Sequence, residues 1–269
     1  MMNLIKNMIS DIMSKSYATF LPKQQLISIC ILTWNRSTFL EMCVDNLLGK
    51  LYYTNNVEIT IMCDGENNQT DKVLEKYKEN SRIRVVRNKT HIGLNAYKKL
   101  FRMLKGDYII VIDDDVLELP SHFDKTMVEY LNLYPDYGFL ALNVIQNEFT
   151  NGAKPDESHY KDDVRHDGIV QEGPAGGWCS CFRRRDYRKI RSIFNFNTLS
   201  MKQSQDGVLS GLFGKYLKLK RGIIKNAICF HASGPYYAKK FGYLKTEIEK
   251  YQSSNLPSFV EHYKTFLDK

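Results

Sequence analysis

Short apolar runs alternate along this chain with segments whose apolar residues recur every three or four positions. The runs are rich in β-branched residues and too short to be buried helices, so we predict strands at 26–33, 57–63, 83–86, 108–113, 138–144 and 223–230. Helical spacing predicts helices between them, at 37–49, 71–80, 96–104 and 121–134. Strands that alternate with helices in this way predict an α/β fold, in which helices cover both faces of a mostly parallel central sheet.

The ends of the chain and one internal stretch depart from this pattern. Residues 1–24 carry apolar side chains at helical spacing, which predicts an amphipathic helix that packs on the body of the protein or on a partner subunit. Residues 236–269 are predicted to form a helical tail behind a single domain at 25–235. Between 146 and 172 the sequence is polar, which predicts a long loop. Its acids and histidines are more typical of a solvated loop than of a metal site: His159, Asp162, Asp163, His166 and Asp167.

Composition narrows the classes of protein. The apolar, charged and aromatic fractions are ordinary for a soluble globular protein, no apolar run is long enough to cross a bilayer, and no signal peptide is visible. The six cysteines lack zinc-site spacing, so we interpret them as reduced thiols of a cytosolic protein. The net charge of +8 comes partly from two basic clusters, at 183–191 and 215–225, which either attract phosphate groups or form solvated helix faces.

Three carboxylates, Asp113, Asp114 and Asp115, end the apolar run that begins at Tyr108. Side chains alternate along a strand, so Asp113 and Asp115 are predicted to point one way and Asp114 the other. Adjacent carboxylates repel one another, and a divalent cation such as Mn²⁺ or Mg²⁺, which prefers oxygen ligands, would relieve the repulsion. The alternative is a solvated turn that caps the helix after Pro120. The buried strand in front of the acids favours the metal site.

Other polar residues also follow predicted strands. Thr33 ends the first strand and Asp64 ends the second. Ligands of parallel sheets bind beyond the carboxyl ends of the strands, so we expect these residues to meet the aspartates at one edge of the sheet. The glycine-rich stretch at 173–178 predicts a tight turn that brings backbone and an indole close to a ligand.

The order of these features resembles glycosyltransferase family 2, whose members have the Rossmann-like GT-A fold, from about Leu26 to about Pro235. Five segments carry the resemblance. Ile29–Arg36 is similar to the family's first strand and turn, and Asp64-Gly65 is similar to the acid that reads the nucleotide base. Asn88–Ala96 resembles the Asn-x-Gly-x-x-x-Ala segment, and Asp113–Asp115 resembles the DxD signature. Gly176-Gly177 with Arg184-Arg185 resembles the acceptor-side segment. Gln205-Asp206 stands where the family usually carries Glu-Asp.

The resemblance implies an enzyme that transfers a sugar with inversion from a UDP-, GDP- or dTDP-sugar to an acceptor hydroxyl. The implied donor-binding residues are Thr33, Asn35, Arg36, Asp64, Gly93, Asp113 and Asp114. The implied ligands of Mn²⁺ or Mg²⁺ are Asp115, Asp113 and His231, and the implied acceptor-side residues are Gly176, Gly177 and Trp178. Asp206 is the candidate catalytic base. It stands alone in that role because Gln205 replaces the usual Glu.

The basic clusters lead to the hypothesis that the acceptor is a glycan of a surface polysaccharide or a lipid-linked oligosaccharide. In this hypothesis the clusters place the acceptor side against the cytoplasmic face of a membrane. Nucleic acid is not an expected partner, because acids at the strand ends repel phosphate in the absence of a metal. Assembly into homo-oligomers stays open. So do three alternatives: a retaining transferase, a catalytically weak scaffold, and a phosphatase of the haloacid dehalogenase type. The phosphatase signature has Thr or Val where this chain has Leu117.

Overall fold

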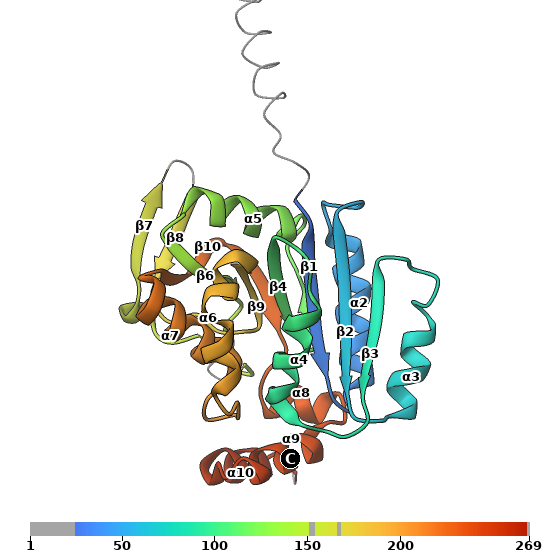
Figure 1. The fold of residues 1–269 in the computed structure, drawn as a ribbon. Helices are drawn as coiled ribbons and strands as arrows, with labels where there is room; N and C mark the ends of the chain where they lie inside the picture. Colours follow the sequence, from blue (N-terminus) through green and yellow to red (C-terminus); the bar gives the residue numbers. More distant parts are fainter. Residues whose placement is uncertain (1–24, 151–153, 166–167, 268–269) are drawn as a thin grey trace, which may run out of the picture.

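The computed structural model describes residues 25–150, 154–165 and 168–267, and the predicted amphipathic helix at 1–24 lies outside them. The predicted alternation of strands and helices is present (Figure 1). The strands are β1 (Ile27–Thr33), β2 (Val57–Asp64), β3 (Ile83–Asn88), β4 (Tyr108–Asp113), β5 (Val116–Glu118), β6 (Tyr137–Val144), β7 (Lys161–Arg165), β8 (Gly168–Glu172), β9 (Cys179–Arg183) and β10 (Lys220–His231). The helices are α2 (Ser37–Lys50), α3 (Asn68–Glu75), α4 (Ala96–Met103), α5 (Phe123–Leu133), α6 (Arg184–Phe196), α7 (Gln205–Leu217), α8 (Pro235–Lys240), α9 (Leu244–Ser253) and α10 (Pro257–Lys264), with 3-10 turns η1 (Gly93–Asn95) and η2 (Glu157–His159).

The strands form one mixed sheet in the order β3-β2-β1-β4-β9-β6-β10-β8-β7, and β5 pairs with β10 off this path. The neighbouring pairs among β3, β2, β1 and β4 are parallel, and so is the pair β6 and β10. The expected α/β fold with a mostly parallel sheet is therefore confirmed. β9 is antiparallel to both β4 and β6 and was not recognised in the sequence. Its five residues are all buried and run directly into α6, so no alternation marks the strand and no turn marks its end.

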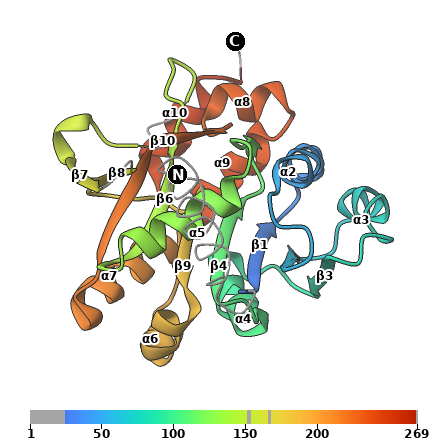
Figure 2. The ribbon, with the colours of Figure 1, turned by 90° about the horizontal axis from the view of Figure 1, so that it is seen from above.

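Helices cover both faces of the sheet, as predicted (Figures 1 and 2). The core on one face contains side chains of α2, α3 and α5, and the core on the other contains side chains of α4, α6 and α7. In β4 the odd and even positions divide between these cores: Ile110 and Ile112 lie in the first, and Ile109 and Val111 in the second. A strand that is buried on both faces reads as a continuous apolar run, and this explains the pattern before Asp113.

The prediction of one long loop over 146–172 is wrong. The hairpin of β7 and β8 occupies part of this stretch and extends the sheet from β10. Charged side chains are typical of an edge strand, because they discourage pairing with another chain, and they hide the alternation that would reveal a strand. Arg165 on β7 donates to Asp136 and Asp163 and fixes the hairpin to the loop before β6.

Three helices, α8, α9 and α10, follow the last strand, in agreement with the predicted helical segment at 236–269. They lie below the carboxyl edge of the sheet (Figure 1). A small cluster of buried side chains, including Leu244, Ile248 and Tyr263, holds α8, α9 and α10 together. No helix of the described residues is long and apolar enough to cross a membrane.

Candidate active site

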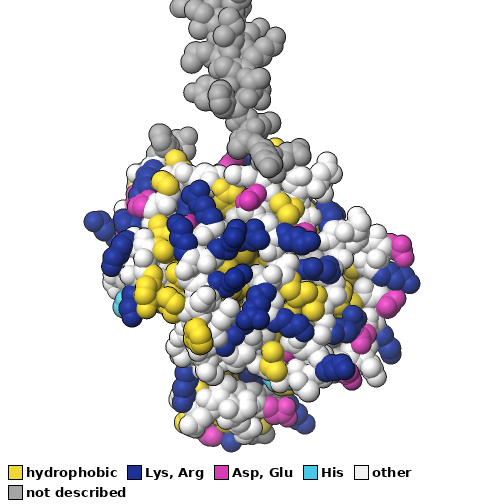
Figure 3. All heavy atoms as spheres, in the orientation of Figure 1, with side chains coloured by type: hydrophobic (Ala, Val, Ile, Leu, Met, Phe, Trp, Pro, Cys, Tyr) yellow, Lys and Arg dark blue, Asp and Glu magenta, His cyan; other side chains and the backbone are white. Residues whose placement is uncertain are grey.

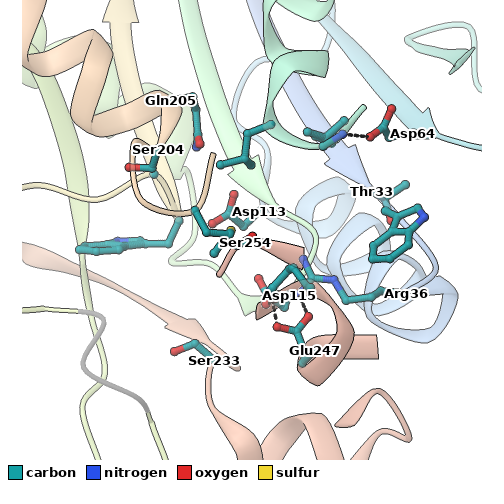
Figure 4. Close-up of a pocket in the computed structure, with 18 of the residues that line it drawn as sticks. Thr33, Arg36, Asp64, Asp113, Asp115, Ser204, Gln205, Ser233, Glu247 and Ser254 are labelled. Carbon is teal, nitrogen blue, oxygen red and sulfur yellow. Dashed lines mark hydrogen bonds and ion pairs between the residues drawn. The ribbon is translucent and has the colours of Figure 1, made fainter. Parts of the chain in front are cut away.

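The carboxyl ends of the strands open into a cavity of about 570 Å³. Thr33 and Asp64, from the ends of β1 and β2, line it together with Asp113 and Asp115 (Figure 4). The structure thus brings together the polar residues that the sequence placed after separate strands. Three of the remaining walls come from the 176–178 turn, the start of α7 and the end of β10.

The three consecutive aspartates divide as alternation predicts. Asp113 and Asp115 line the cavity, whereas Asp114 does not and is fully buried. The carboxylate of Asp114 accepts a short hydrogen bond from Nη2 of Arg36. Asp114, an implied donor-binding residue, therefore contacts the guanidinium of Arg36 and does not face the cavity.

Asp113, Asp115 and His231 form a candidate metal site. One ligand atom from each lies within 4.8 Å of the others, and Nε2 of His231 is 2.9 Å from Oδ1 of Asp115. Two carboxylates and an imidazole fit Mn²⁺ or Mg²⁺, and the imidazole suits Mn²⁺ better, because Mg²⁺ prefers all-oxygen surroundings. Among the described residues, this is the group of three or more His, Cys, Asp or Glu side chains whose ligand atoms lie this close to one another. His231 ends β10, far from the aspartates in sequence, and the sheet brings it to them.

Burial and neighbouring charges together shift the pKa values of Asp113, Asp115 and His231. Burial and the negative charge of Asp115 raise the pKa of Asp113 to about 6. Burial alone would also raise the pKa of Asp115, but Arg36 and His231 outweigh it and hold that pKa well below its usual value. The same pair of carboxylates raises the pKa of His231 against the effect of its burial. Negative charge is therefore concentrated on Asp115, where a cation is best stabilised.

Arg36 lines the cavity, as expected, but its guanidinium is engaged by protein acids. Nη1 lies 2.8 Å from Oδ2 of Asp115 and 3.5 Å from Oε1 of Glu247, and Nη2 binds Asp114. Asn35 does not line the cavity, and the structure places its side-chain oxygen 2.8 Å from Nδ2 of Asn67. Its left-handed backbone, with φ of 53°, forms the turn that aims Arg36 toward the aspartates.

Asp64 organises the turn that follows β3. Its carboxylate accepts from the backbone N–H of Gly93 at 2.7 Å and of Ile92 at 3.0 Å, and from Nδ2 of Asn88 at 2.8 Å. Nδ1 of His91 lies 2.8 Å away. Asp64, which we expect to read the nucleotide base, thus also shapes the 91–93 turn. Gly93 has φ of 61°, a conformation that favours glycine.

An aromatic pair lies beside this turn. The rings of Trp34 and His91 stack with centroids 4.0 Å apart, and both residues line the cavity. The apolar surface of the pair, next to Asp64, can accept a flat heterocycle. Trp34 follows β1 and His91 follows β3, and the fold brings the two rings together.

The acceptor-side segment packs against the start of α7. A Cβ atom on Gly177 would lie 2.7 Å from Nε2 of Gln205 and 3.3 Å from Cβ of Asp206, so a larger residue would displace the Gln205 amide and press on Asp206. A Cβ on Gly176 would lie 2.1 Å from the ring of Trp178. Trp178 is buried and donates from Nε1 to the carbonyl of Leu142 at 2.8 Å, which fixes the turn on β6.

Asp206 lines the cavity from the first turn of α7. Ser204 occupies the N-cap position, so Asp206 does not cap the helix. Asp113, Asp115 and His231 line the same cavity, so the candidate base and the candidate metal site face one space.

No pattern in the sequence indicates that α9 and α10 take part in this site. Glu247, Lys250 and Tyr251 of α9 and Tyr263 of α10 line the cavity. Glu247 is 7% exposed, which is unusual for an acid in a helix and is explained by its contacts with Arg36 and Lys250. The helical pattern of the tail predicted its secondary structure, but nothing local indicates which strand end it covers.

Solved structures with the same architecture include nucleotide-sugar enzymes. The mannosyltransferase PcManGT from Pyrobaculum calidifontis, solved with GDP-Man and Mn²⁺, is 16% identical and matches 86% of this chain and 62% of its own with a TM-score of 0.62. Residues 1–349 of TarS from S. aureus are 13% identical and match 90% of this chain and 69% of their own with a TM-score of 0.60. These matches establish the GT-A fold.

Curated relatives match part of the chain. The glycosyltransferase GlyG of Streptococcus pneumoniae serotype 4 is 24% identical over 151 residues, which are 55% of this chain and 47% of GlyG. The uncharacterized glycosyltransferase EpsJ of Bacillus subtilis is 30% identical over 106 residues, 39% of this chain and 30% of EpsJ. The chain thus spans less than half the length of these relatives.

The sequence profile of the family "Glycosyl transferase family 2" matches residues 28–201, more than half of the chain. The match covers β1, the Asp113–Asp115 strand end and the 176–178 turn. The match argues against the phosphatase alternative. The phosphatase signature belongs on the first strand of its domain, whereas these aspartates end β4. The chain belongs to glycosyl transferase family 2.

Proposed function

We propose that this protein transfers a sugar from a nucleoside diphosphate sugar to an acceptor hydroxyl, with a divalent metal and with inversion at the anomeric carbon. One observation carries the proposal: the cluster of Asp113, Asp115 and His231 faces the same cavity as Asp206. The family and the fold support the donor class, because PcManGT was solved with GDP-Man and Mn²⁺ and TarS with UDP and UDP-GlcNAc.

In this proposal Asp113, Asp115 and His231 hold Mn²⁺ or Mg²⁺. The metal supplies a Lewis acid that neutralises the charge of the leaving diphosphate. The Trp34–His91 pair and the 91–93 turn receive the nucleoside, and Thr33 borders it from β1.

Asp206 takes the proton of the acceptor hydroxyl as that oxygen attacks the anomeric carbon. Attack from the face opposite the diphosphate inverts the anomeric centre. Gly177 keeps Asp206 in place by allowing α7 to approach the 176–178 turn, and the neutral Gln205 beside it cannot serve as a base. The anomeric configuration of the product, read by NMR, separates this mechanism from a retaining one.

We infer further that the acceptor is a glycan of a surface polysaccharide or a lipid-linked oligosaccharide, and that the protein works on the cytoplasmic face of a membrane. The outer faces of α4, α6 and α7 support a membrane contact. Basic side chains dominate this face (Figure 3), and the acids of these helices, Asp186 and Asp206, are respectively buried and turned into the cavity. Anionic lipid attracts such a surface.

The membrane contact is tested with the exposed arginines of α6. Arg185 and Arg188 lie on its exposed side, and Phe196 at its end is 90% exposed. Replacing both arginines with glutamine should weaken binding to vesicles that contain phosphatidylserine and leave binding to neutral vesicles unchanged. Equal binding of the variant and the wild type to anionic vesicles would refute the contact.

The donor is identified by thermal stability with UDP, GDP, dTDP and CDP, each with and without Mn²⁺. A ligand that binds the native state raises the melting temperature by mass action. We expect one nucleotide to do so, only with Mn²⁺ present. Asp115→Ala should abolish the shift, while Asp162→Ala, a surface acid paired with Lys225, should retain it. If no nucleotide shifts the wild type, the donor site is absent and the scaffold alternative takes its place.

A further inference from the structure

Helix α9 places a lysine at the wall of the cavity, close to the candidate metal site. Leu244, Ile248 and Tyr251 anchor the helix in the core that it shares with α8 and α10. Glu247 and Lys250, one turn apart, project toward the cavity and line it. The structure thus presents a cation from an element that contributes nothing to the sheet.

The described residues that line the cavity include two with permanently charged basic side chains, Arg36 and Lys250. Arg36 is held by Asp114, Asp115 and Glu247. Among the described residues the acid paired with Lys250 is Glu247, over a short distance, and the side chain of Lys250 is 26% exposed. Its Nζ also lies 5.0 Å from the centroid of the Tyr251 ring. Glu247 also contacts Arg36, which lies 2.8 Å from Asp115, so one carboxylate and one guanidinium link the ammonium group to the cluster of Asp113, Asp115 and His231. Lys250 is therefore the cation that can change partners at little cost.

Glu247 makes this exchange feasible. Its Oε1 faces Arg36 and its Oε2 faces Lys250, so the carboxylate keeps one cationic partner when the other leaves. A buried carboxylate that loses every partner would destabilise the fold, whereas one that retains Arg36 does not. A diphosphate oxygen is a stronger partner for an ammonium group than a carboxylate that is already shared.

We propose that Lys250 binds the diphosphate of the nucleotide donor and leaves Glu247 to do so. This inference rests on the proposed function, since it assigns a contact within the same site. It makes α9 a part of the donor site and gives the C-terminal helices a role in binding. No covalent step is added: one ion pair is exchanged for another as the nucleotide enters.

The test compares diphosphates with monophosphates. Affinities for UDP, GDP, UMP and GMP with Mn²⁺ are measured by calorimetry for the wild type, Lys250→Met, Lys250→Arg and Lys245→Met. Lys245 is exposed on the same helix and serves as the matched control. Loss of a charge-assisted hydrogen bond should weaken the diphosphate about ten- to a hundredfold in Lys250→Met. The monophosphate should change little, and Lys250→Arg and Lys245→Met should stay near the wild type.

Two outcomes overturn the inference. One is a Lys250→Met protein that binds the diphosphate as tightly as Lys245→Met does. The other is an equal loss for monophosphate and diphosphate, which would mean that the substitution disturbs α9 and removes no phosphate contact. Failure of the proposed function looks different, because the wild type itself would then bind none of the four nucleotides, and the inference would fall with it. Circular dichroism melts of each variant show that it is folded under the conditions of the titration.

Discussion

Arg183 belongs to the basic cluster of the sequence, yet the structure uses it as an internal brace. Its side chain is 4% exposed. The guanidinium donates to the carbonyl of Tyr137 at 2.7 Å, to that of Tyr134 at 3.3 Å and, over a short distance, to that of Leu131, and it lies 3.5 Å from Asp186. One side chain thus satisfies the end of α5, the start of β6 and an acid of α6.

Replacing Arg183 with methionine keeps most of the volume and removes these bonds. Each buried carbonyl left without a donor costs about 1–3 kcal/mol, and breaking a buried ion pair costs about 3–5 kcal/mol. Water and local rearrangement recover part of this, so we expect about 3–5 kcal/mol in total. In a chain of this size each 1 kcal/mol lowers the melting temperature by about 2–4 °C, which predicts a fall of about 6–20 °C.

The assay is thermal unfolding followed by circular dichroism, with Arg188→Met as the matched control. Arg188 lies on the exposed side of α6, the helix that follows Arg183, so its loss should change the melting temperature by less than about 2 °C. A melting temperature of Arg183→Met that equals that of Arg188→Met would refute the argument from buried hydrogen bonds. The result also decides which arginines belong in a test of membrane binding, because a destabilised variant cannot report on lipid contact.

Three further substitutions test the site and its surroundings. Gly177→Ala should displace the Gln205 amide, press on Asp206 and lower kcat by up to about a hundredfold, with nucleotide affinity retained in calorimetry. Asp206→Asn should lower the transfer rate about 10²- to 10⁴-fold while the Mn²⁺-dependent thermal shift with nucleotide persists; loss of both would make Asp206 a structural residue. Hydrogen bonds from Arg165 lower the pKa of Asp136 and of Asp163, so their stabilising contribution is complete above the unfolded pKa of about 4 and is lost as the pH falls through the lowered folded values. The melting temperature of Arg165→Ala should therefore fall less than that of the wild type upon acidification from about pH 5 to about pH 2, and parallel curves would contradict this.

The fold could be predicted where each segment carries its own signal. β1, β2 and β4 are buried on both faces by two helical layers, so their sequences are continuous apolar runs. β9 and the β7–β8 hairpin lack such a signal. β9 is five residues between a glycine turn and a helix, and β7 is a charged edge strand that depends on β8 for its pairing. Their place in the sheet is decided by tertiary contacts, which a local pattern does not contain.

The candidate site divides along the same line. Thr33, Asp64, Asp113 and Asp115 could be placed together because parallel strands end at one edge of a sheet. The details of hydrogen bonding could not. The sequence does not show that Asp64 is satisfied by the 91–93 turn, or that the side chain of Asn35 binds Asn67 outside the cavity. These contacts depend on backbone directions that are fixed only in the folded chain.

The position of Arg36 shows why the C-terminal helices matter to the site. Asp114 and Asp115 are adjacent, buried carboxylates, and burial raises the pKa of Asp114 to about 7 in spite of Arg36. Without a nearby cation, burial would favour the protonation of Asp115 as well. Arg36 supplies that cation, and it is itself held between the aspartates and Glu247 of α9. An ion pair in a low-dielectric setting is favourable only when its groups are held in good geometry, and here α9 provides one of the fixed points. The charge state of the candidate metal site is thus coupled to a helix 130 residues further along the chain, and a family profile that ends at residue 201 does not include it.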